Sequence, residues 1–145
     1  MIVYLDASAL VKRYVQEMGS EAVRRLIEGA ELLGTAAITR VEMAAALAKA
    51  ARVGVLSQEE AALALRVFRE DWPSLVRIQV TEPLLRRAEA VAWEEGLRGY
   101  DATHLAAALF WHDMVGEPVT MATFDRQLWD AARRVGLEVF PEEMW

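Results

Sequence analysis

The sequence has no cysteine and no asparagine, and only two of its 16 cationic side chains are lysines, Lys12 and Lys49. The absence of cysteine excludes disulfides, thiolate metal sites and thiol nucleophiles. Long apolar runs are also missing, since the longest stretch without Asp, Glu, Lys or Arg covers only residues 102–112. A bilayer span needs roughly 20 apolar residues. With no basic leader before MIVYLD, we expect a cytoplasmic protein that does not enter a membrane.

The composition indicates a single domain over residues 1–145. The chain is 54% hydrophobic and 26% charged, which is enough to build a core of its own. Its net charge of −6 argues against a passive basic surface for phosphates. The same charge suits carboxylates that gather around divalent cations. The excess of arginine over lysine favours bidentate phosphate contacts, although codon bias would explain it equally well.

Short apolar runs alternate with helical periods, and this alternation predicts an α/β fold with a mostly parallel sheet. The expected strands cover residues 2–5, 32–38, 76–80, 119–124 and 137–140, and the alternating pattern of 76–80 is typical of an edge strand. Three helix starts carry capping signals. Ser20 is expected to cap one helix, Ser57 and Glu60 form a capping box for another, and Thr81 begins a third.

Four acids stand at predicted helix starts: Asp6, Glu42, Asp101 and Asp125. A purely structural role explains each one taken alone, because acids are favoured as caps and in the first turn of a helix. Thr39 and Glu42 even have the spacing of a capping box.

The order of strands and acids suggests a functional role as well. Residues that follow parallel strands meet at one edge of the sheet, so we expect the four carboxylates to share one cleft. They would repel one another there unless cations bridge them, and no lysine is near any of them in sequence. Mg²⁺ or Mn²⁺ is the natural counter-ion, because these hard cations take oxygen ligands. Two such ions about 3.5–4 Å apart can activate a water and stabilise a leaving phosphodiester oxygen.

Several neighbours of the acids fit supporting roles. Ser8 and Thr123 are placed to orient carboxylates or metal-bound waters, or to cap locally. His104 follows Asp101 by one helical turn, and we expect it to be a packed, hydrogen-bonded core histidine. Three arginines flank the acids and either hold RNA phosphates or only keep the surface soluble: Arg40, Arg98 and Arg126.

Four segments together resemble the PIN-domain ribonucleases, and among them the VapC-type toxins of toxin–antitoxin pairs: MIVYLDASALVKRY, ITRVEMAAAL, GYDATHLAAAL and ATFDRQL. The resemblance implies a three-layer α/β/α sandwich with strand order 3-2-1-4-5. It also implies cleavage of RNA, usually tRNA or rRNA, by attack of a water bound to Mg²⁺ or Mn²⁺. By position, Asp6, Glu42 and Asp101 match the family's three near-universal acids, Asp125 matches the fourth, and Thr123 matches the hydroxyl residue before it.

The resemblance also implies partners, namely a second copy in a homodimer and a cognate antitoxin that lies along a hydrophobic groove. Large aromatic side chains are candidates for such surfaces, or else belong to the core. The candidates are Phe68, Trp72, Trp111, Trp129 and the terminal Met144 and Trp145.

Other functions fit less well. A phosphoacceptor receiver domain needs paired acids after its first strand and a late lysine, but Ala7 follows Asp6 and the last lysine is Lys49. No glycine-rich nucleotide-binding motif occurs. The remaining alternative is a catalytically weak or inactive PIN-like domain that binds metal, RNA or a protein partner.

Overall fold

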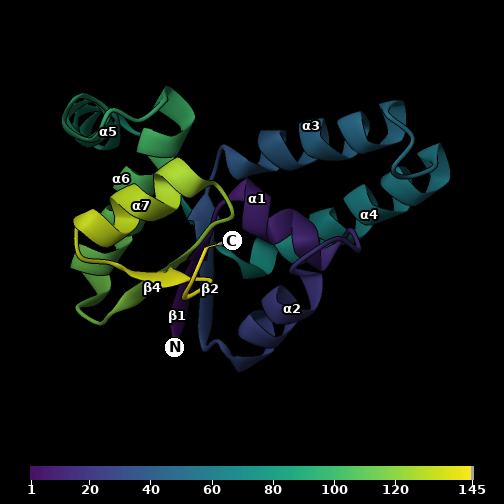
Figure 1. Ribbon diagram of the computed structural model, residues 1–145, viewed down its shortest axis with the longest axis horizontal. Helices are drawn as coiled ribbons and strands as arrows, with labels where there is room; N and C mark the ends of the chain where they lie inside the picture. Colours follow the sequence, from purple (N-terminus) through teal and green to yellow (C-terminus); the bar gives the residue numbers. More distant parts are fainter. Residues whose placement is uncertain (145) are drawn as a thin grey trace.

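A computed structural model describes residues 1–144 and places a five-stranded parallel sheet at the centre of the molecule (Figure 1). The strands are β1 (Ile2–Leu5), β2 (Leu32–Ala36), β3 (Val76–Ile78), β4 (Val119–Ala122) and β5 (Glu138–Phe140). Their order is β3-β2-β1-β4-β5, with every neighbouring pair parallel. The predicted α/β class, strand order and edge position of the third strand are confirmed.

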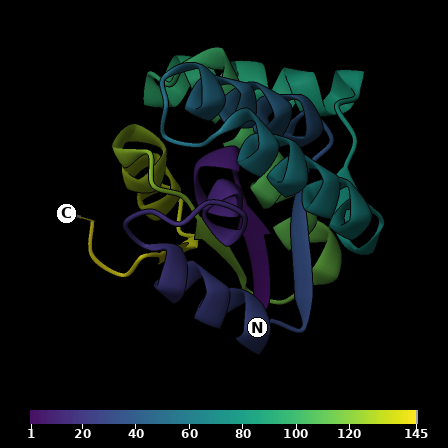
Figure 2. The same ribbon diagram turned by 90° about the vertical axis from the view of Figure 1, so that its right-hand side faces the viewer.

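Helices cover both faces of this sheet. The helical elements are α1 (Ala7–Leu10), η1 (Val11–Arg13), α2 (Ser20–Gly29), α3 (Thr39–Arg52), α4 (Gln58–Asp71), η2 (Trp72–Ser74), α5 (Glu82–Glu95), α6 (Gly99–Val115) and α7 (Arg126–Arg134). Side chains alternate along β1, so Ile2 and Tyr4 pack against α5, α6 and α7, while Val3 and Leu5 pack against α1 and α2. The result is a three-layer sandwich, from which α3 and α4 project as an antiparallel arm (Figures 1 and 2).

Local capping explains where two helices begin. Ser57 Oγ accepts from the Glu60 amide at 3.0 Å, and the Glu60 carboxylate accepts from the Ser57 amide at 2.9 Å, so the predicted capping box is confirmed. Thr81 caps α5 as predicted, through the amide of Leu84.

The prediction for Ser20 was wrong, because this residue is already the first of α2 and Gly19 holds the cap position with φ at 89°. The Ser20 hydroxyl instead donates to the carbonyl of Val15 at 2.8 Å and accepts from the amide of Glu17 at 2.9 Å. It therefore closes the loop in front of the helix.

Four strands are shorter than predicted. β2 stops at Ala36 and β4 at Ala122, and β3 and β5 also lose residues at one end. Past its end, β2 keeps one further sheet contact, from the amide of Ala37 to the carbonyl of Ile78 at 2.9 Å. Ile38 then adopts helical backbone angles and becomes the residue before α3. The last residues of the predicted β2, β3 and β4 runs therefore belong to the turns that lead into helices.

Most of the predicted interface aromatics belong to the core. Phe68, Trp72, Trp111 and Trp129 are all buried, and Met144 is half-buried. Trp145 lies outside the described residues. Trp93 on α5, which is not among the predicted interface residues, is 89% exposed. Among residues 1–144, no helix combines the length and the apolar character that crossing a membrane requires.

Helix α6 packs directly on the sheet at Gly34 in β2. A Cβ atom at this position would lie 2.5 Å from Cζ3 of Trp111, which is closer than van der Waals contact allows. We expect Gly34→Ala to lower the free energy of unfolding by about 1–3 kcal/mol, because the buried indole ring must move. Urea denaturation measures this loss.

Gly29→Ala is the matched control for this substitution. Gly29 is the last residue of α2, and a Cβ added there meets nothing within 4 Å. Its stability should stay equal to that of the wild type or rise slightly. Equal effects of the two substitutions would show that the contact with Trp111 does not constrain the fold.

Candidate active site

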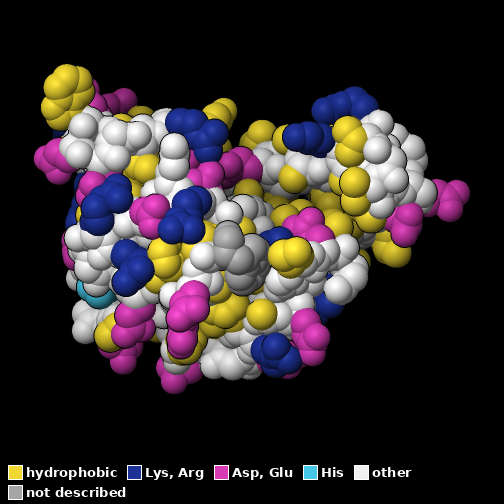
Figure 3. Space-filling view, viewed as in Figure 1, with side chains coloured by type: hydrophobic (Ala, Val, Ile, Leu, Met, Phe, Trp, Pro, Cys, Tyr) yellow, Lys and Arg dark blue, Asp and Glu magenta, His cyan; other side chains and the backbone are white. Residues whose placement is uncertain are grey.

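Three of the four acids follow strands at the carboxyl edge of the sheet. Asp6 comes directly after β1 and caps α1, and Asp125 follows β4 and caps α7. Glu42 lies in the first turn of α3, the helix that follows β2. Asp101 reaches the site from α6, of which it is part of the first turn. The surface is notched between the arm of α3 and α4 and the rest of the molecule, with acidic side chains at the inner end of the notch (Figure 3).

Asp6 is buried, and three donors hold its carboxylate. Oδ1 accepts from the Ser8 hydroxyl at 2.7 Å and from the Ala9 amide at 3.0 Å, while Oδ2 accepts from the Thr123 hydroxyl at 2.6 Å. Burial raises the pKa of Asp6 above its ordinary value, although the charge of His104 and these donors act in the opposite direction. Asp6 is therefore both a helix cap and a fixed acceptor at the sheet edge.

Thr123 connects Asp6 with Asp125. Besides donating to Asp6, its Oγ1 accepts from the amide of Asp125 at 3.1 Å. Ser8 makes a similar link, because its Oγ also accepts from the amide of Phe124 at 2.9 Å. The two hydroxyls thus join the loop after β4 to the loop after β1.

Glu42 is held by His104 and not by a capping box. Its Oε1 lies 2.6 Å from His104 Nε2, and His104 Nδ1 lies 2.7 Å from the phenol oxygen of Tyr4. Thr39 is the first residue of α3, and its hydroxyl accepts from Thr35. His104 is a packed, hydrogen-bonded histidine as expected, but it belongs to the acidic site as well.

The environment of His104 favours its charged form. Burial lowers its pKa, but the hydrogen bond to Glu42 and the charges of Asp6, Glu42 and Asp101 together raise it above its ordinary value. As an imidazolium, His104 donates Nε2–H to Glu42 and Nδ1–H to the Tyr4 oxygen.

Arg98 bridges the other two acids. Its Nη2 lies 2.9 Å from Asp125 Oδ2 and 3.2 Å from Asp101 Oδ2, and its Nε lies 3.3 Å from the same Asp101 oxygen. The pKa of Asp101 is nevertheless raised, first by burial and then by the charge of Asp125, against the effects of Arg98 and His104. His104 therefore interacts electrostatically with Asp6, Glu42 and Asp101, while Arg98 contacts Asp101 and Asp125.

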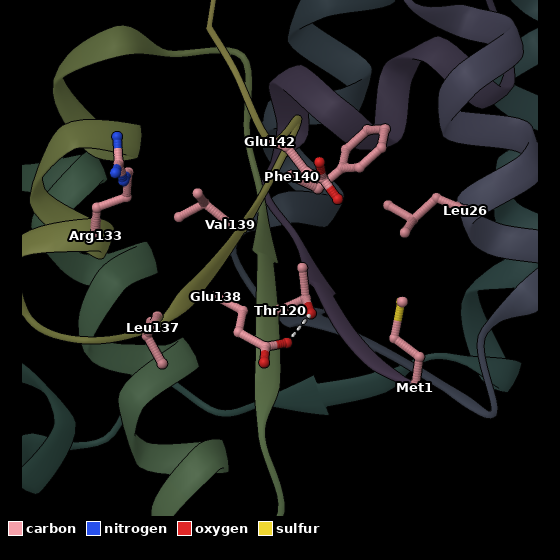
Figure 4. Close-up of a pocket in the computed structure, with 9 residues that line it drawn as sticks. All are labelled: Met1, Leu26, Thr120, Arg133, Leu137, Glu138, Val139, Phe140 and Glu142. Atoms are coloured by element: carbon pink, nitrogen blue, oxygen red, sulfur yellow. Dashed lines mark hydrogen bonds between the residues drawn. The ribbon is translucent and has the colours of Figure 1, made fainter.

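A separate hollow of about 520 Å³ lies beside β5. Leu26 and Met1 face it from one side and Val139 and Leu137 from the other, and Thr120 donates to Glu138 within it at 3.3 Å (Figure 4). None of the four acids lines it, so this hollow is not the predicted site.

Comparison with known proteins places this geometry in a family. The sequence profile of the PIN domain matches residues 3–134. The chain belongs to the PIN-domain family. This PIN domain is 35% identical over 144 residues to ribonuclease VapC45 of Mycobacterium tuberculosis, an alignment that covers 99% of this chain and 97% of the relative.

Two solved structures share the fold of this PIN domain. A crystal structure of a protein from Pyrobaculum aerophilum has 25% sequence identity and a TM-score of 0.66, and the match covers 96% of this chain and 83% of the other. The VapBC2 proteins of Rickettsia felis, solved bound to a DNA fragment from their promoter, give a TM-score of 0.64 at 14% identity, with 100% and 99% covered.

The donors of this PIN domain suit a hard divalent cation, because carboxylate oxygens are the ligands that Mg²⁺ and Mn²⁺ prefer. Oδ1 of Asp101 accepts no hydrogen bond from the described residues, and it is open to solvent, since no buried side-chain polar atom among them lacks a partner. As arranged within residues 1–144, however, no three acidic or histidine side chains form a group able to hold a metal ion.

Sequence reasoning named Arg98 and His104 but did not predict that they contact the acids. It searched for lysines, whereas Arg98 and His104 supply the charge from positions three residues before and three residues after Asp101. This spacing is itself a signal, because residues three apart in a helix share a face. The contacts with Glu42 and Asp125 join distant parts of the chain and had no comparable signal.

The raised pKa values of Asp6, Asp101 and His104 predict how the free energy of unfolding depends on pH without metal. For Asp6 and Asp101, the folded protein binds more protons than the unfolded chain between their ordinary value of 3.8 and the raised value. The same holds for His104 above 6.5. In EDTA we therefore expect the free energy of unfolding to fall as the pH rises from about 4 to 8.

Urea denaturation across this pH range measures the effect, with Asp101→Asn as the comparison. The variant cannot ionise at position 101, so its stability should fall less steeply than that of the wild type. A wild-type stability that rises with pH over this range would contradict the raised carboxyl values.

Proposed function

We propose that this PIN domain is an Mg²⁺- or Mn²⁺-dependent endoribonuclease that hydrolyses RNA phosphodiester bonds, and that it is the toxin of a VapBC-type pair. What supports the proposal is the placement of four acids at or near helix starts around the carboxyl edge of a parallel sheet, with Arg98 in contact with Asp101 and Asp125. The name of the relative, ribonuclease VapC45, supports the same activity. We take tRNA or rRNA as the substrate class, as the family resemblance implies.

In this proposal Asp6, Glu42 and Asp101 hold the metal, and Asp125 serves a weaker second ion. When bound, the metal supplies an activated water and neutralises charge that develops on the phosphate. The chain's own residues position these ligands. Ser8 and Thr123 fix the orientation of Asp6 through their hydroxyls, and His104 fixes Glu42.

Two exposed arginines are available for the RNA backbone. Arg40 stands at the start of α3 and Arg126 at the start of α7, each near an acid of the site. Arg126 makes an exposed ion pair with Asp130 and lies over the ring of Trp129, and water weakens the ion pair, so its guanidinium can turn to a phosphate.

The alternative is a PIN domain that binds metal, RNA or a partner without cleaving. One observation favours it, namely that each of the four acids already has a hydrogen-bond partner from the chain itself. A site completed in this way is stable without any metal. Activity measurements decide between the two functions.

We expect Asp101→Asn to lower metal-dependent RNA cleavage by about a hundredfold or more, because it removes a charged ligand of the metal. The assay incubates purified protein with tRNA and structured RNA in Mg²⁺, Mn²⁺ or EDTA. Asp113→Asn is the matched control, since Asp113 lies on the same helix, exposed and paired with Arg87, away from the site. This control should cleave like the wild type.

Cleavage that survives both EDTA and Asp101→Asn would indicate a contaminating nuclease and leave the domain without demonstrated activity. If wild-type protein folds, binds Mn²⁺ and yet cleaves no RNA in the pool, the binding function takes precedence.

An apolar groove fits the proposed antitoxin. Tyr14, Val15, Leu56, Leu63 and Val67 line a hollow of about 530 Å³ between the end of η1 and helix α4. Leu63 and Val67 are exposed, although both are aliphatic. Exposed aliphatic side chains along a groove favour the apolar face of a partner helix. The homodimer implied by the resemblance remains a prediction, which the molar mass in solution tests.

We expect Leu63→Glu to abolish co-purification with the antitoxin encoded beside the gene, because a charge would be buried in the interface. Leu85→Glu on α5 is the control, since Leu85 is also an exposed leucine but lies outside the groove. Pull-down after co-expression measures both variants. Loss of binding in both, or in neither, would place the antitoxin elsewhere.

A further inference from the structure

Arg98 occupies an unusual position for its residue type. It is the N-cap of α6, where Ser, Thr, Asp and Asn are preferred, and its side chain makes no capping hydrogen bond. A positive charge at a helix N-terminus is also disfavoured by the helix dipole. The placement of Arg98 therefore does not stabilise the helix, and its contacts with acids account for the conformation of the side chain.

Those contacts occupy one oxygen of each carboxylate, which a metal ion bridging this pair would also use. Arg98 Nη2 reaches Oδ2 of Asp101 and Oδ2 of Asp125 together, so one guanidinium neutralises both carboxylates. A divalent cation coordinates carboxylate oxygens at about 2.0–2.1 Å, a distance that leaves no space for a guanidinium between the same two oxygens. The arginine and a cation that bridges this pair therefore exclude each other.

The contacts of Arg98 with Asp101 and Asp125 can open. The Arg98 side chain is 71% exposed, whereas those of Asp101 and Asp125 are much less so. Ion pairs in contact with water are weak, and an exposed arginine can turn into solvent at little cost to itself, which leaves Asp101 and Asp125 free to take another counter-ion. The acids, in contrast, are fixed at helix starts and stay in place.

We propose that Arg98 is the resident counter-ion of the Asp101–Asp125 pair and that a divalent cation binds there by displacing it. This inference rests on the proposed function, since Asp101 and Asp125 are among the acids to which that function assigns metal ions. Arg98 then sets the concentration of metal at which the site fills.

Binding of Mn²⁺ alone tests this role, by calorimetric titration of wild type, Arg98→Gln and Arg126→Gln at neutral pH. We expect Arg98→Gln to bind Mn²⁺ about three- to tenfold more tightly. A change in affinity of this size is expected when the cation no longer has to break the two ion pairs of an exposed arginine. Arg126→Gln is the matched control, because Arg126 is next to Asp125 in sequence and loses the same charge but contacts only Asp130 among the acids. It should stay within about twofold of wild type, as distant exposed charges are screened.

Thermal unfolding gives a second measurement that a structural role would not reproduce. In EDTA the Arg98→Gln protein should melt below the wild type, because Asp101 and Asp125 then repel each other without a counter-ion. Saturating Mn²⁺ should raise its melting temperature more than it raises that of the wild type. A purely structural arginine would lower both melting temperatures equally and leave the shift with Mn²⁺ unchanged.

The outcomes separate this inference from the proposed function. If wild type binds Mn²⁺ and needs it for cleavage, but Arg98→Gln binds it equally or more weakly, the counter-ion role is wrong and the ribonuclease stands. Equal tightening by Arg126→Gln would also overturn the role, because charge alone would then explain the effect. If neither wild type nor Arg98→Gln binds Mn²⁺, both the inference and the metal-dependent function are wrong.

Discussion

Repulsion between carboxylates at one edge of the sheet is the constraint on which the rest of the site depends. Parallel strands deliver their following residues to the same edge, so the topology that gathers Asp6, Glu42 and Asp125 also gathers their charge. Hydrogen-bond donors and cationic side chains of the chain itself offset this repulsion. Asp6 takes hydrogen bonds from Thr123 and its own loop, and the other acids take the charges of His104 and Arg98.

Helix α6 supplies most of this compensation and is fixed by the core. Arg98, Asp101 and His104 follow one another along its first turns, so the helix brings an acid together with two counter-charges. Farther along, Ala106, Ala107 and Ala108 are fully buried, and Trp111 lies against Gly34. Small side chains and a glycine let the helix approach the sheet closely. The packing at one end of α6 therefore determines where the charges at the other end lie.

Local signals in the sequence predicted much of this arrangement. The buried run of β1, the capping box at Ser57 and the start of α5 at Thr81 each depend on neighbouring residues, and each has the predicted form. The strand ends and the role of Ser20 differ from the prediction. Tertiary contacts decide where a strand turns into a helix and which way a hydroxyl points. The sheet edge at which the acids lie could be predicted from the expected topology, but the residues that contact the acids could not. The bond between Tyr4 and His104 joins residues 100 positions apart, and no periodicity reveals such a contact.

The four acids divide into a pair with buried partners and a pair with an exposed partner, and this division bears on the proposed catalysis. Asp6 and Glu42 are held by buried partners, Thr123 and His104, whose removal would leave polar groups unsatisfied. Asp101 and Asp125 share an exposed arginine that water can replace. A surface that only binds a partner has no need of this asymmetry. The proposed metal site would use it, because Asp6 and Glu42 would keep the position of the site while Asp101 and Asp125 would complete the coordination once Arg98 turns into solvent.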